Sequence, residues 1–267
     1  MTLQIEIKSF VQKKWGSNDI ERFPGPQPVS IEKKHIKILS EKQYVVCEKT
    51  DGVRHFLVCF TDSQNRKICA LVNRSFEYTL YPLTVPRDTL LDGELIDDKF
   101  IVHDAVIIQG EDLRNKNLHE RLGKVKALVK IIVPSKIRVI CKNMIPYSDT
   151  KTLVLGEKTD GCIFTPIDEP IRMGTHRTMF KWKPREKITI DFLIKDSGEF
   201  CIQHEGRLLS VQKTKTDFTG IVECYFDGTS WVPEKKRLDK SHPNNKRTYE
   251  RTLVNITENI QFSELIQ

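Results

Sequence analysis

Residues 47–54 combine an amine, a carboxylate and a guanidinium at the close spacing that a reactive turn needs: Cys47-Glu48-Lys49-Thr50-Asp51-Gly52-Val53-Arg54. Apolar residues at 44–46 and 56–58 flank this segment, which predicts a strand, a tight loop and a second strand. Gly52 permits a sharp bend in the loop. The charged groups would then lie together at the mouth of a sheet. An exposed turn without chemical activity has the same composition, so the segment alone leaves both interpretations open.

Two lysines stand two positions apart in a later apolar stretch, Phe180-Lys181-Trp182-Lys183-Pro184. Side chains two apart on a strand point to the same face, so Lys181 and Lys183 would converge on one site. Two ammonium groups on one face can neutralise a bound phosphate and stabilise charge on a leaving group. The structural alternative is a basic edge strand.

The chain length of 267 residues allows one large domain or two modest ones, with enough interior for a core. Hydrophobic residues make up 39% and charged residues 30%, a composition that is ordinary for a soluble globular protein and argues against wholesale disorder. Lys+Arg 43 against Asp+Glu 36 gives a formal charge of +7, which suits a polyanionic partner without requiring one.

The seven cysteines are scattered, odd in number and without a CxxC pair. This usage predicts buried, reduced thiols in a cytosolic or nuclear protein, ahead of disulfides or a zinc site. The first residues lack a signal-peptide core, and no uninterrupted apolar run approaches the length of a membrane span. We therefore expect a soluble intracellular protein that does not enter a membrane.

Hydrophobic periodicity predicts helices over residues 3–14, 113–132 and 247–260. Three prolines and a glycine within residues 22–31 predict a stiff extended loop that excludes regular structure. Strands are predicted over residues 44–60, 67–73, 100–106 and 136–141, and a strand, a turn and a strand over residues 90–96. Beyond Pro184, short strands separated by polar turns suggest a small β-barrel with strands over residues 188–193, 200–203, 208–212 and 220–226.

Lys49 to Arg54 is similar to the Lys-x-Asp-Gly-x-Arg nucleophile motif of covalent nucleotidyltransferases, which include nucleic-acid ligases and mRNA capping guanylyltransferases. Two further segments resemble the guanylyltransferases and differ from ligases. Phe-Pro-Gly-x-Gln-Pro-Val-Ser at residues 23–30 resembles the segment near their guanine pocket. Arg-x-Asp-Lys-x-x-Pro-Asn at residues 237–244 resembles their last motif. The matches run in family order from about residue 22 to 244, so the chain resembles a compact mRNA capping guanylyltransferase of the eukaryotic and large-DNA-virus type.

A second Lys-Thr-Asp-Gly begins at Lys158, so two lysines compete for the role of nucleophile. The first copy has Arg54 where the family grips the sugar, whereas the second copy has Ile163 there. The other motifs follow the first copy in order, and the second copy leaves little chain for them. The second copy instead matches the later Asp-Gly-(Leu/Ile)-Ile-Phe motif, in which Cys162 is a small departure. Lys49 is therefore the predicted nucleophile.

The resemblance implies nucleotide-binding roles for Thr50, Arg54, Glu94, His103, Lys142, Asp160, Lys181, Lys183, Arg237, Asp239 and Lys240. In this family Arg54 and Glu94 would hold the ribose. His103 would stack on guanine, where relatives usually carry Phe or Tyr, with less area than a phenyl ring. Lys142 would read the edge of the base.

The remaining roles concern the phosphates. By resemblance, Lys181 and Lys183 grip the α-phosphate, and Asp160 assists metal or phosphate contacts as the candidate metal ligand. Arg237 and Lys240 would reach the β and γ phosphates only when their domain closes over the nucleotide, so that closure orients pyrophosphate and reopening admits RNA.

The implied fold class is α+β. A nucleotidyltransferase domain over residues 1–184 would be built on antiparallel sheets with a nucleotide cleft and completed by the C-terminal helix over 245–267. A C-terminal OB-fold β-barrel over residues 185–244 would carry the last motif.

The implied function is mRNA 5′ capping: GMP passes from GTP to Lys49 as a phosphoamide and then to the diphosphate 5′ end of RNA. The implied cofactor is a divalent metal, Mg²⁺ or Mn²⁺. The implied partners are GTP and RNA, and the family adds the tail of RNA polymerase II, an RNA triphosphatase and a cap methyltransferase. This chain has no evident room for the last two activities, which we expect in separate proteins or in parts of a longer polypeptide. The expected location is the nucleus, or a viral factory or the cytoplasm for a viral protein.

Two alternatives remain at this point. An ATP-dependent RNA or DNA ligase would share the scaffold and differ in nucleotide preference. An OB-type RNA-binding module with a decayed transferase site would form no covalent nucleotide adduct.

Overall fold

Strand β3 (Val53–Thr61) runs through the middle of the largest sheet, and its apolar residues alternate between two cores. Phe56, Val58 and Phe60 pack in one core with helix α1 (Leu3–Trp15), and Leu57 and Cys59 pack in the other with helix α3 (Leu118–Val129). Because helices cover both faces, the strand is an uninterrupted apolar run rather than an alternating one.

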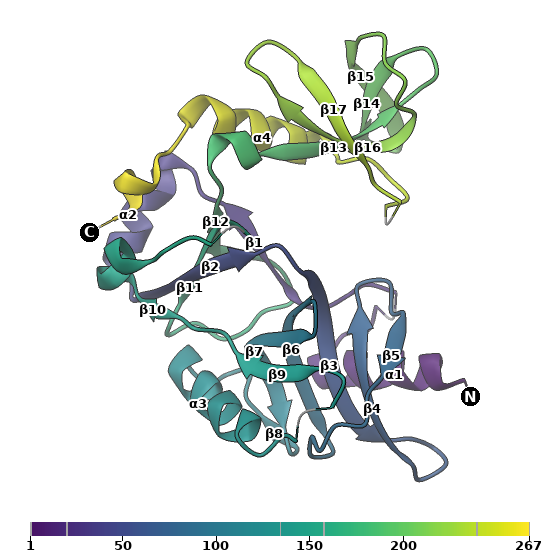
Figure 1. Cartoon of the computed structure of the whole chain (residues 1–267), viewed down its shortest axis with the longest axis vertical. Coiled ribbons are helices and arrows are strands. Elements are labelled where there is room, and N and C mark those ends of the chain that lie inside the picture. The colour runs from purple at the N-terminus through teal and green to yellow at the C-terminus, as the bar shows by residue number, and fades with distance from the viewer. Residues whose placement is uncertain (1, 20, 134, 157, 239, 267) are drawn as a thin grey trace. The chain divides into compact units, whose positions relative to one another are not determined.

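The computed structural model describes residues 2–19, 21–133, 135–156, 158–238 and 240–266. The chain divides into two compact units (Figure 1). Unit 1 contains the residues up to Val29 and Ile38–Lys181, and unit 2 contains Ser30–Lys37 and Trp182–Ile266. Helix α2 (Lys33–Glu41) falls on the division between them. No helix among the described residues is both long and apolar enough to cross a membrane.

Unit 1 holds two sheets, and the turn after Thr50 connects a strand of one to a strand of the other. The larger has the order β5-β4-β3-β6-β7-β8, with β9 parallel to β7; besides β3 its strands are β4 (Lys67–Asn73), β5 (Tyr78–Leu80), β6 (Thr89–Ile96), β7 (Lys99–Ile108), β8 (Glu111–Asp112) and β9 (Arg138–Cys141). The smaller has the order β1-β12-β11-β2-β10, with β1 (Pro26–Ser30), β2 (Tyr44–Thr50), β10 (Ile145–Pro146), β11 (Thr159–Pro166) and β12 (Gly174–Trp182). A 3₁₀ turn, η1 (Tyr147–Thr152), follows β10.

The chain passes from the smaller sheet to the larger one between β2 and β3, through Asp51 and Gly52. A Cβ atom on Gly52 would lie 2.5 Å from Ile96 Cγ1 and 2.9 Å from the Leu95 carbonyl oxygen. Only glycine fits this crossing, which places Lys49 at the end of one sheet and Arg54 at the start of the other.

Unit 2 is built on a five-stranded antiparallel sheet of OB-like type with the order β15-β14-β13-β16-β17. Its strands are β13 (Thr189–Ile194), β14 (Glu199–His204), β15 (Arg207–Lys213), β16 (Gly220–Phe226) and β17 (Trp231–Lys236). Two 3₁₀ turns, η2 (Arg185–Lys187) and η3 (Phe262–Leu265), flank the unit's sheet and helix in sequence. Among the described residues, no pairing joins the edge strands β15 and β17, so the sheet is not closed into a barrel.

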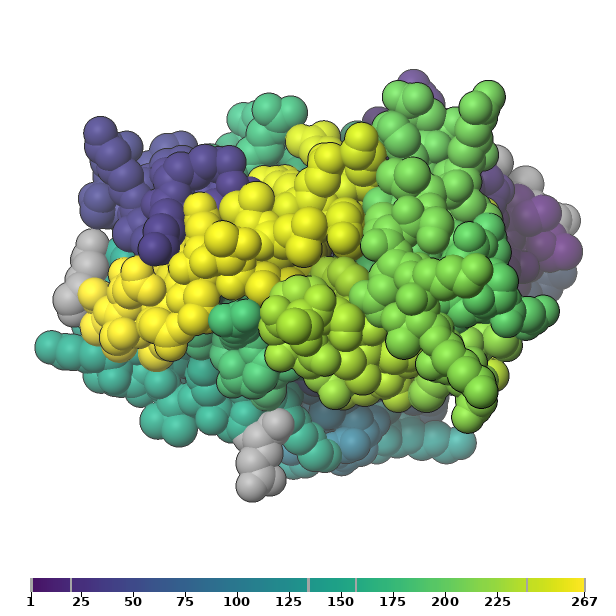
Figure 2. All heavy atoms as spheres, turned by 90° about the horizontal axis from the view of Figure 1, so that it is seen from above, coloured from purple at the N-terminus to yellow at the C-terminus, as the bar shows by residue number. Residues whose placement is uncertain are grey.

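Helix α4 (Lys246–Glu258) packs on this sheet, with Tyr249 and Leu253 against the core around Phe192. Another neighbour is the segment at residues 30–37, and Figure 2 shows violet-blue atoms of this part of the chain beside the yellow atoms of the C-terminal part. Arg251 Nη2 donates to Glu32 Oε1 over 3.0 Å, and Asn255 Nδ2 donates to the Ile31 carbonyl over 2.6 Å. The contacts group α4 with unit 2, whereas the sequence assigned residues 245–267 to the first domain. The domain boundaries themselves, at 184 and 244, stay a prediction.

The α+β class with antiparallel sheets is confirmed, as are the helices near the two ends of the chain. All seven cysteines are free in the structure, six of them buried and Cys141 half-buried, and their reduced state in the cell stays a prediction. Three local predictions were wrong. Residues 26–30 form strand β1 despite their prolines, because β1 lies at the edge of its sheet, where a missing N–H is tolerated. Residues 90–96 belong to one continuous strand rather than a strand, a turn and a strand. The predicted helix over 113–132 begins only at Leu118 and ends at Val129.

The last two differences have local causes. Gly93 sits where a Cβ would lie 2.5 Å from the Ile101 carbonyl oxygen and 2.7 Å from the Phe100 ring, so it marks a close approach between strands and not a bend. Asn117 and Glu120 form a capping box, each side chain accepting from the other's backbone N–H, which fixes the first turn of α3.

Candidate active site

The two Lys-Thr-Asp-Gly copies lie side by side on the antiparallel strands β2 and β11, with Thr50 opposite Thr159. A β-bulge between Thr159 and Cys162 makes room for the second copy's aspartate, and its Gly161 has a φ of 138°. Lys49 Nζ donates to Asp160 Oδ2 over 3.0 Å, and both side chains are about one-fifth exposed, at 21% and 20%. The copies that competed for one role thus supply the two halves of one ion pair.

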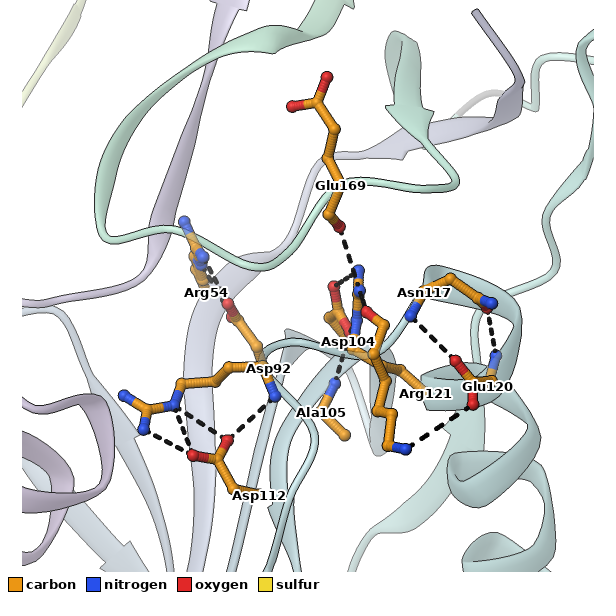
Figure 3. A network of polar contacts seen from close by, with 11 residues as sticks. Arg54, Asp92, Asp104, Ala105, Asp112, Asn117, Glu120, Arg121 and Glu169 are labelled. Atoms are coloured by element: carbon orange, nitrogen blue, oxygen red, sulfur yellow. Dashed lines mark hydrogen bonds and ion pairs between the residues drawn. The ribbon is translucent and has the colours of Figure 1, made fainter.

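Arg54 is held by a buried carboxylate from the neighbouring strand β6 (Figure 3). Its Nε donates to Asp92 Oδ1 over 2.9 Å and its Nη2 to Asp92 Oδ2, which is the two-point pairing that suits a guanidinium. Asp92 is 1% exposed. Burial alone would raise the pKa of Asp92, but Arg54, His103 and Arg74 together hold that pKa below its ordinary value.

His103 reaches the same carboxylate through a bulge in strand β7. Asp92 pairs with Asp104 and Gly93 pairs with Val102, so His103 is the extra residue between two ladder positions. Its Nε2 lies 3.6 Å from Asp92 Oδ1. Bulges often re-aim a side chain beside an active site, and this one turns the imidazole toward the carboxylate that holds Arg54.

Thr50 links two further predicted residues. Its hydroxyl contacts Glu94 Oε2, and Lys142 Nζ donates to Thr50 Oγ1 over 3.4 Å. Lys142 is buried at 8% exposure, and its backbone N–H donates to the Val102 carbonyl over 2.7 Å, next to His103. The structure therefore brings together seven of the predicted residues in unit 1: Lys49, Thr50, Arg54, Glu94, His103, Lys142 and Asp160.

Arg74 and Asp92 were missed by the sequence analysis. Although Arg74 is exposed overall, desolvation and the nearby Arg54 lower its pKa, while Asp92 and Glu94 act in the opposite direction. Arg74 Nη2 also donates to Gln27 Oε1 over 3.3 Å. Asp92 could have been found from the sequence, because it stands two residues before the predicted Glu94 in the segment Asp92-Gly93-Glu94. Arg74 stands in a turn, and no local pattern there indicates a ligand contact.

The predicted phosphate lysines are divided between the units. Lys181 is half-buried at the end of β12, in the same sheet as Lys49, with β11 between their strands. Lys183 belongs to unit 2. Their convergence on one phosphate stays a prediction.

The last motif gathers around one carboxylate in unit 2. Arg237 Nη1 lies 2.9 Å from Asp191 Oδ1 and 3.4 Å from Glu223 Oε2, and Lys240 Nζ lies 3.7 Å from Asp191 Oδ2. Asp191 and Glu223 are directly opposite each other on β13 and β16, where two like charges are unfavourable without a cation between them. Arg237 supplies that cation. Asp239 lies outside the described residues.

Few of the described side chains at the candidate site could coordinate a metal ion. No group of three His, Cys, Asp or Glu side chains with metal-binding geometry occurs among the described residues. Mg²⁺ is commonly held by one or two carboxylates together with substrate phosphates, and Asp160 is a carboxylate placed beside the candidate nucleophile. The residues fit an ion that arrives with a nucleotide.

Family models match almost the whole chain. The model described as mRNA capping enzyme, catalytic domain, matches residues 1–185, and the model described as mRNA capping enzyme, C-terminal domain, matches residues 176–266.

Curated proteins give the same result. The chain is 28% identical to the mRNA-capping enzyme subunit alpha of Schizosaccharomyces pombe, over 98% of this chain and 83% of that protein. It is 27% identical to the mRNA-capping enzyme of Danio rerio, over 85% of this chain and 46% of that protein. The chain thus spans less than half of the zebrafish relative. A solved structure, mycobacterial DNA ligase D complexed with ATP and MES, is similar with a TM-score of 0.46 and 13% identity, over 80% of this chain and 96% of that one.

Proposed function

Because this chain belongs to the mRNA capping enzyme family and is thus a nucleotidyltransferase of the guanylyltransferase type, we propose that it caps RNA through a covalent bond between GMP and Lys49. The observation that carries the covalent step is the position of the Lys49 amine, part-buried and 3.0 Å from Asp160. Thr50, Arg54, Glu94 and Lys142 surround the same end of the two sheets.

In the first transfer, the lone pair of Lys49 Nζ attacks the α-phosphorus of GTP. A P–N bond forms, the P–O bond to pyrophosphate breaks, and the amine loses a proton. In the second transfer, an oxygen of the RNA 5′ diphosphate attacks the same phosphorus, the P–N bond breaks, and Lys49 regains a proton. The covalent intermediate divides one difficult displacement into two easier ones.

Asp160 has two effects on Lys49. Its carboxylate holds the amine in place through the ion pair. The same carboxylate, 3.0 Å away, is a base within hydrogen-bond reach that can accept the departing proton. A divalent metal bound by Asp160 and the nucleotide phosphates would supply charge neutralisation at the α-phosphate.

The other side chains bind and orient the nucleotide. Arg54 and Glu94 are proposed to hold the ribose, and Lys142 and His103 to contact the base. Lys181 and Lys183 are proposed for the α-phosphate, and Arg237 and Lys240 for the β and γ phosphates. Arg237→Ala should therefore reduce GMP attachment to Lys49, and unchanged attachment would contradict that assignment.

The whole pathway extends beyond this chain. We propose that it works in the nucleus, or in a viral factory or the cytoplasm if viral, with Mg²⁺ or Mn²⁺. An RNA triphosphatase, a cap methyltransferase and a polymerase II tail are proposed as partners on the family resemblance alone.

The test is incubation with α-³²P-labelled GTP or ATP and a divalent metal, followed by a denaturing gel. Label from GTP is expected in the wild type and in Lys158→Ala, and none in Lys49→Ala. Lys158 is the matched control, because it begins the second copy of the same tetrapeptide yet is 75% exposed and paired with Asp97. Label from ATP instead would indicate a ligase, and no label from either nucleotide would indicate a binding module.

A further inference from the structure

The segment Phe23–Gln27 lies against the guanidinium of Arg54. Arg54 Nη1 donates to the Pro26 carbonyl oxygen over 2.5 Å, and Arg54 Cζ lies 5.5 Å from the centre of the Phe23 ring. A guanidinium over an aromatic face gains a cation–π attraction. Asp92 holds the same guanidinium from β6, as Figure 3 shows. Arg54 is therefore fixed from two sides.

Phe23 is itself held in place. Its ring stacks on Phe56 with the centroids 4.1 Å apart and the planes 10° from parallel. Phe56 stands two positions after Arg54 on β3, so it projects to the same side of that strand. Phe23 thus belongs to the core on the α1 side of the sheet and cannot shift without disturbing it.

Gly25 gives the guanidinium its space. A Cβ atom at this position would lie 2.5 Å from Arg54 Nη2 and 2.8 Å from Phe23 Cε1. The φ of Gly25 is not in the left-handed region, so the backbone would accept an alanine. The glycine is required for room beside Arg54 and not for a turn.

We infer that the segment Phe23–Gln27, here called the arginine seat, positions Arg54 for the nucleotide. Gly25 is the positioning residue within it, because it leaves the space that the guanidinium occupies. The inference rests on the proposed function. Three of the five N–H groups of Arg54 have acceptors among the described residues, two on Asp92 and one on Pro26. The two that remain, one on Nη1 and one on Nη2, have no acceptor among the described residues, and guanidinium N–H groups suit the hydroxyl or phosphate oxygens of a nucleotide.

The same segment contacts the second arginine of the site. Gln27 Oε1 accepts from Arg74 Nη2 over 3.3 Å, and Arg74 is close enough to Arg54 for the two cations to affect each other. Two like charges side by side require acceptors to hold them, and Gln27, Pro26 and Asp92 provide these. One short segment therefore sets the spacing of two cations that face an anionic ligand.

The test is Gly25→Ala, with Gly123→Ala as the matched control. Gly123 lies in α3 and a Cβ there would meet no atom within 4 Å. Because Phe23 is locked on Phe56, the added methyl should displace Arg54 rather than unfold the chain. We expect a melting temperature close to that of the wild type, a KM for GTP in adduct formation raised about 10- to 100-fold by lost charged hydrogen bonds, and little change in kcat.

Two further measurements separate positioning from a general effect. The ¹⁵N–¹H resonance of Arg54 Nε, assigned by its absence in Arg54→Lys, should move in Gly25→Ala and stay in place in Gly123→Ala. In an Arg54→Ala background, Gly25→Ala should cost no further kcat/KM, because the guanidinium that the methyl would displace is gone and only its contact with the Phe23 ring remains.

Either an unmoved Arg54 resonance, an unchanged KM, or full additivity with Arg54→Ala would overturn the inference. If the wild type forms no adduct with GTP, the proposed function fails, and the seat is still judged by the Arg54 resonance alone. If the Arg54 resonance then moves in Gly25→Ala and not in the control, the segment does position Arg54, but for a ligand other than GTP.

Discussion

Arg121 of helix α3 makes the most deeply buried ion pair of the described residues in unit 1, with Asp104 of β7. Its Nε and Nη2 donate to the two carboxylate oxygens over 2.7 and 3.0 Å, and its Nη1 donates to the Lys116 carbonyl over 2.5 Å (Figure 3). The side chains are 2% and 6% exposed. We predict that Arg121→Met, which keeps an unbranched side chain but removes the guanidinium, lowers the free energy of unfolding by about 3–5 kcal/mol.

The magnitude comes from what the substitution leaves behind. Asp104 would keep one acceptor contact, from the Ala105 N–H over 2.8 Å, and would otherwise be a buried charge without a partner. Replacing both residues, as Arg121→Met with Asp104→Leu, removes that charge. The double variant should therefore be more stable than Arg121→Met alone, because a buried pair exchanged for apolar groups is often close to neutral.

The assay is urea unfolding followed by circular dichroism, with Lys124→Met as the control. Lys124 pairs with Glu111 over 2.8 Å at the surface, with side chains 52% and 46% exposed, so its loss should cost less than about 0.5 kcal/mol. A loss below about 1 kcal/mol in Arg121→Met, equal to that of the control, would refute the argument from burial. A double variant no better than the single one would refute the argument from the unpaired charge.

Further predictions concern the loss of stability at low pH, a helix cap and the accessibility of the thiols. The pKa of Asp92 is lowered in the folded state, so its stabilisation is present above the unfolded value of about 3.9 and is lost as pH falls below it. Stability should therefore fall more steeply on acidification in the wild type than in Asp92→Asn, measured by urea midpoints from pH 6 to 3. Asn117→Ala should cost about 1 kcal/mol in urea unfolding, whereas Asn115→Ala, outside the capping box, should not. In the native protein a thiol reagent should modify no cysteine other than Cys141, since the other six are buried. After denaturation it should modify all seven.

The sequence predicted the elements whose pattern is local. The amphipathic helix at the N-terminus and the apolar strands follow from periodicity, since each buries a face that its own residues define. The structural roles of some glycines and prolines were predicted wrongly, because each of these residues is compatible with two different local structures. Gly93 permits a turn or a close approach of strands, and only the position of Phe100 decides between them. The prolines of β1 are compatible with a strand only at a sheet edge, which depends on the order of strands far away in sequence.

The partners of the site residues were harder to predict than the residues themselves. Asp92 holds Arg54 from 38 positions along the chain, and this pairing depends on the register between β3 and β6. His103 meets the same carboxylate only because a bulge shifts it out of the ladder. No residue type announces a bulge in a single sequence, so the aim of a side chain can be predicted only after its strand pairing is known.

The repeated Lys-Thr-Asp-Gly shows why a motif acquires its chemistry from its surroundings. The first copy stands where strand β2 ends and the second where strand β11 begins, so in this antiparallel pair the same four residues meet at one end with the chain running in opposite directions. Lys49 is thereby part-buried against Asp160, whereas Lys158 is 75% exposed and paired with a solvated Asp97. An ion pair at the exposed surface holds its amine only weakly, whereas a part-buried amine beside one carboxylate is fixed and has an acceptor for its proton. The second copy contributes its aspartate because the bulge turns that residue, and not its lysine, toward the first. The chemical asymmetry of two identical tetrapeptides therefore arises from strand order and one extra residue in the ladder.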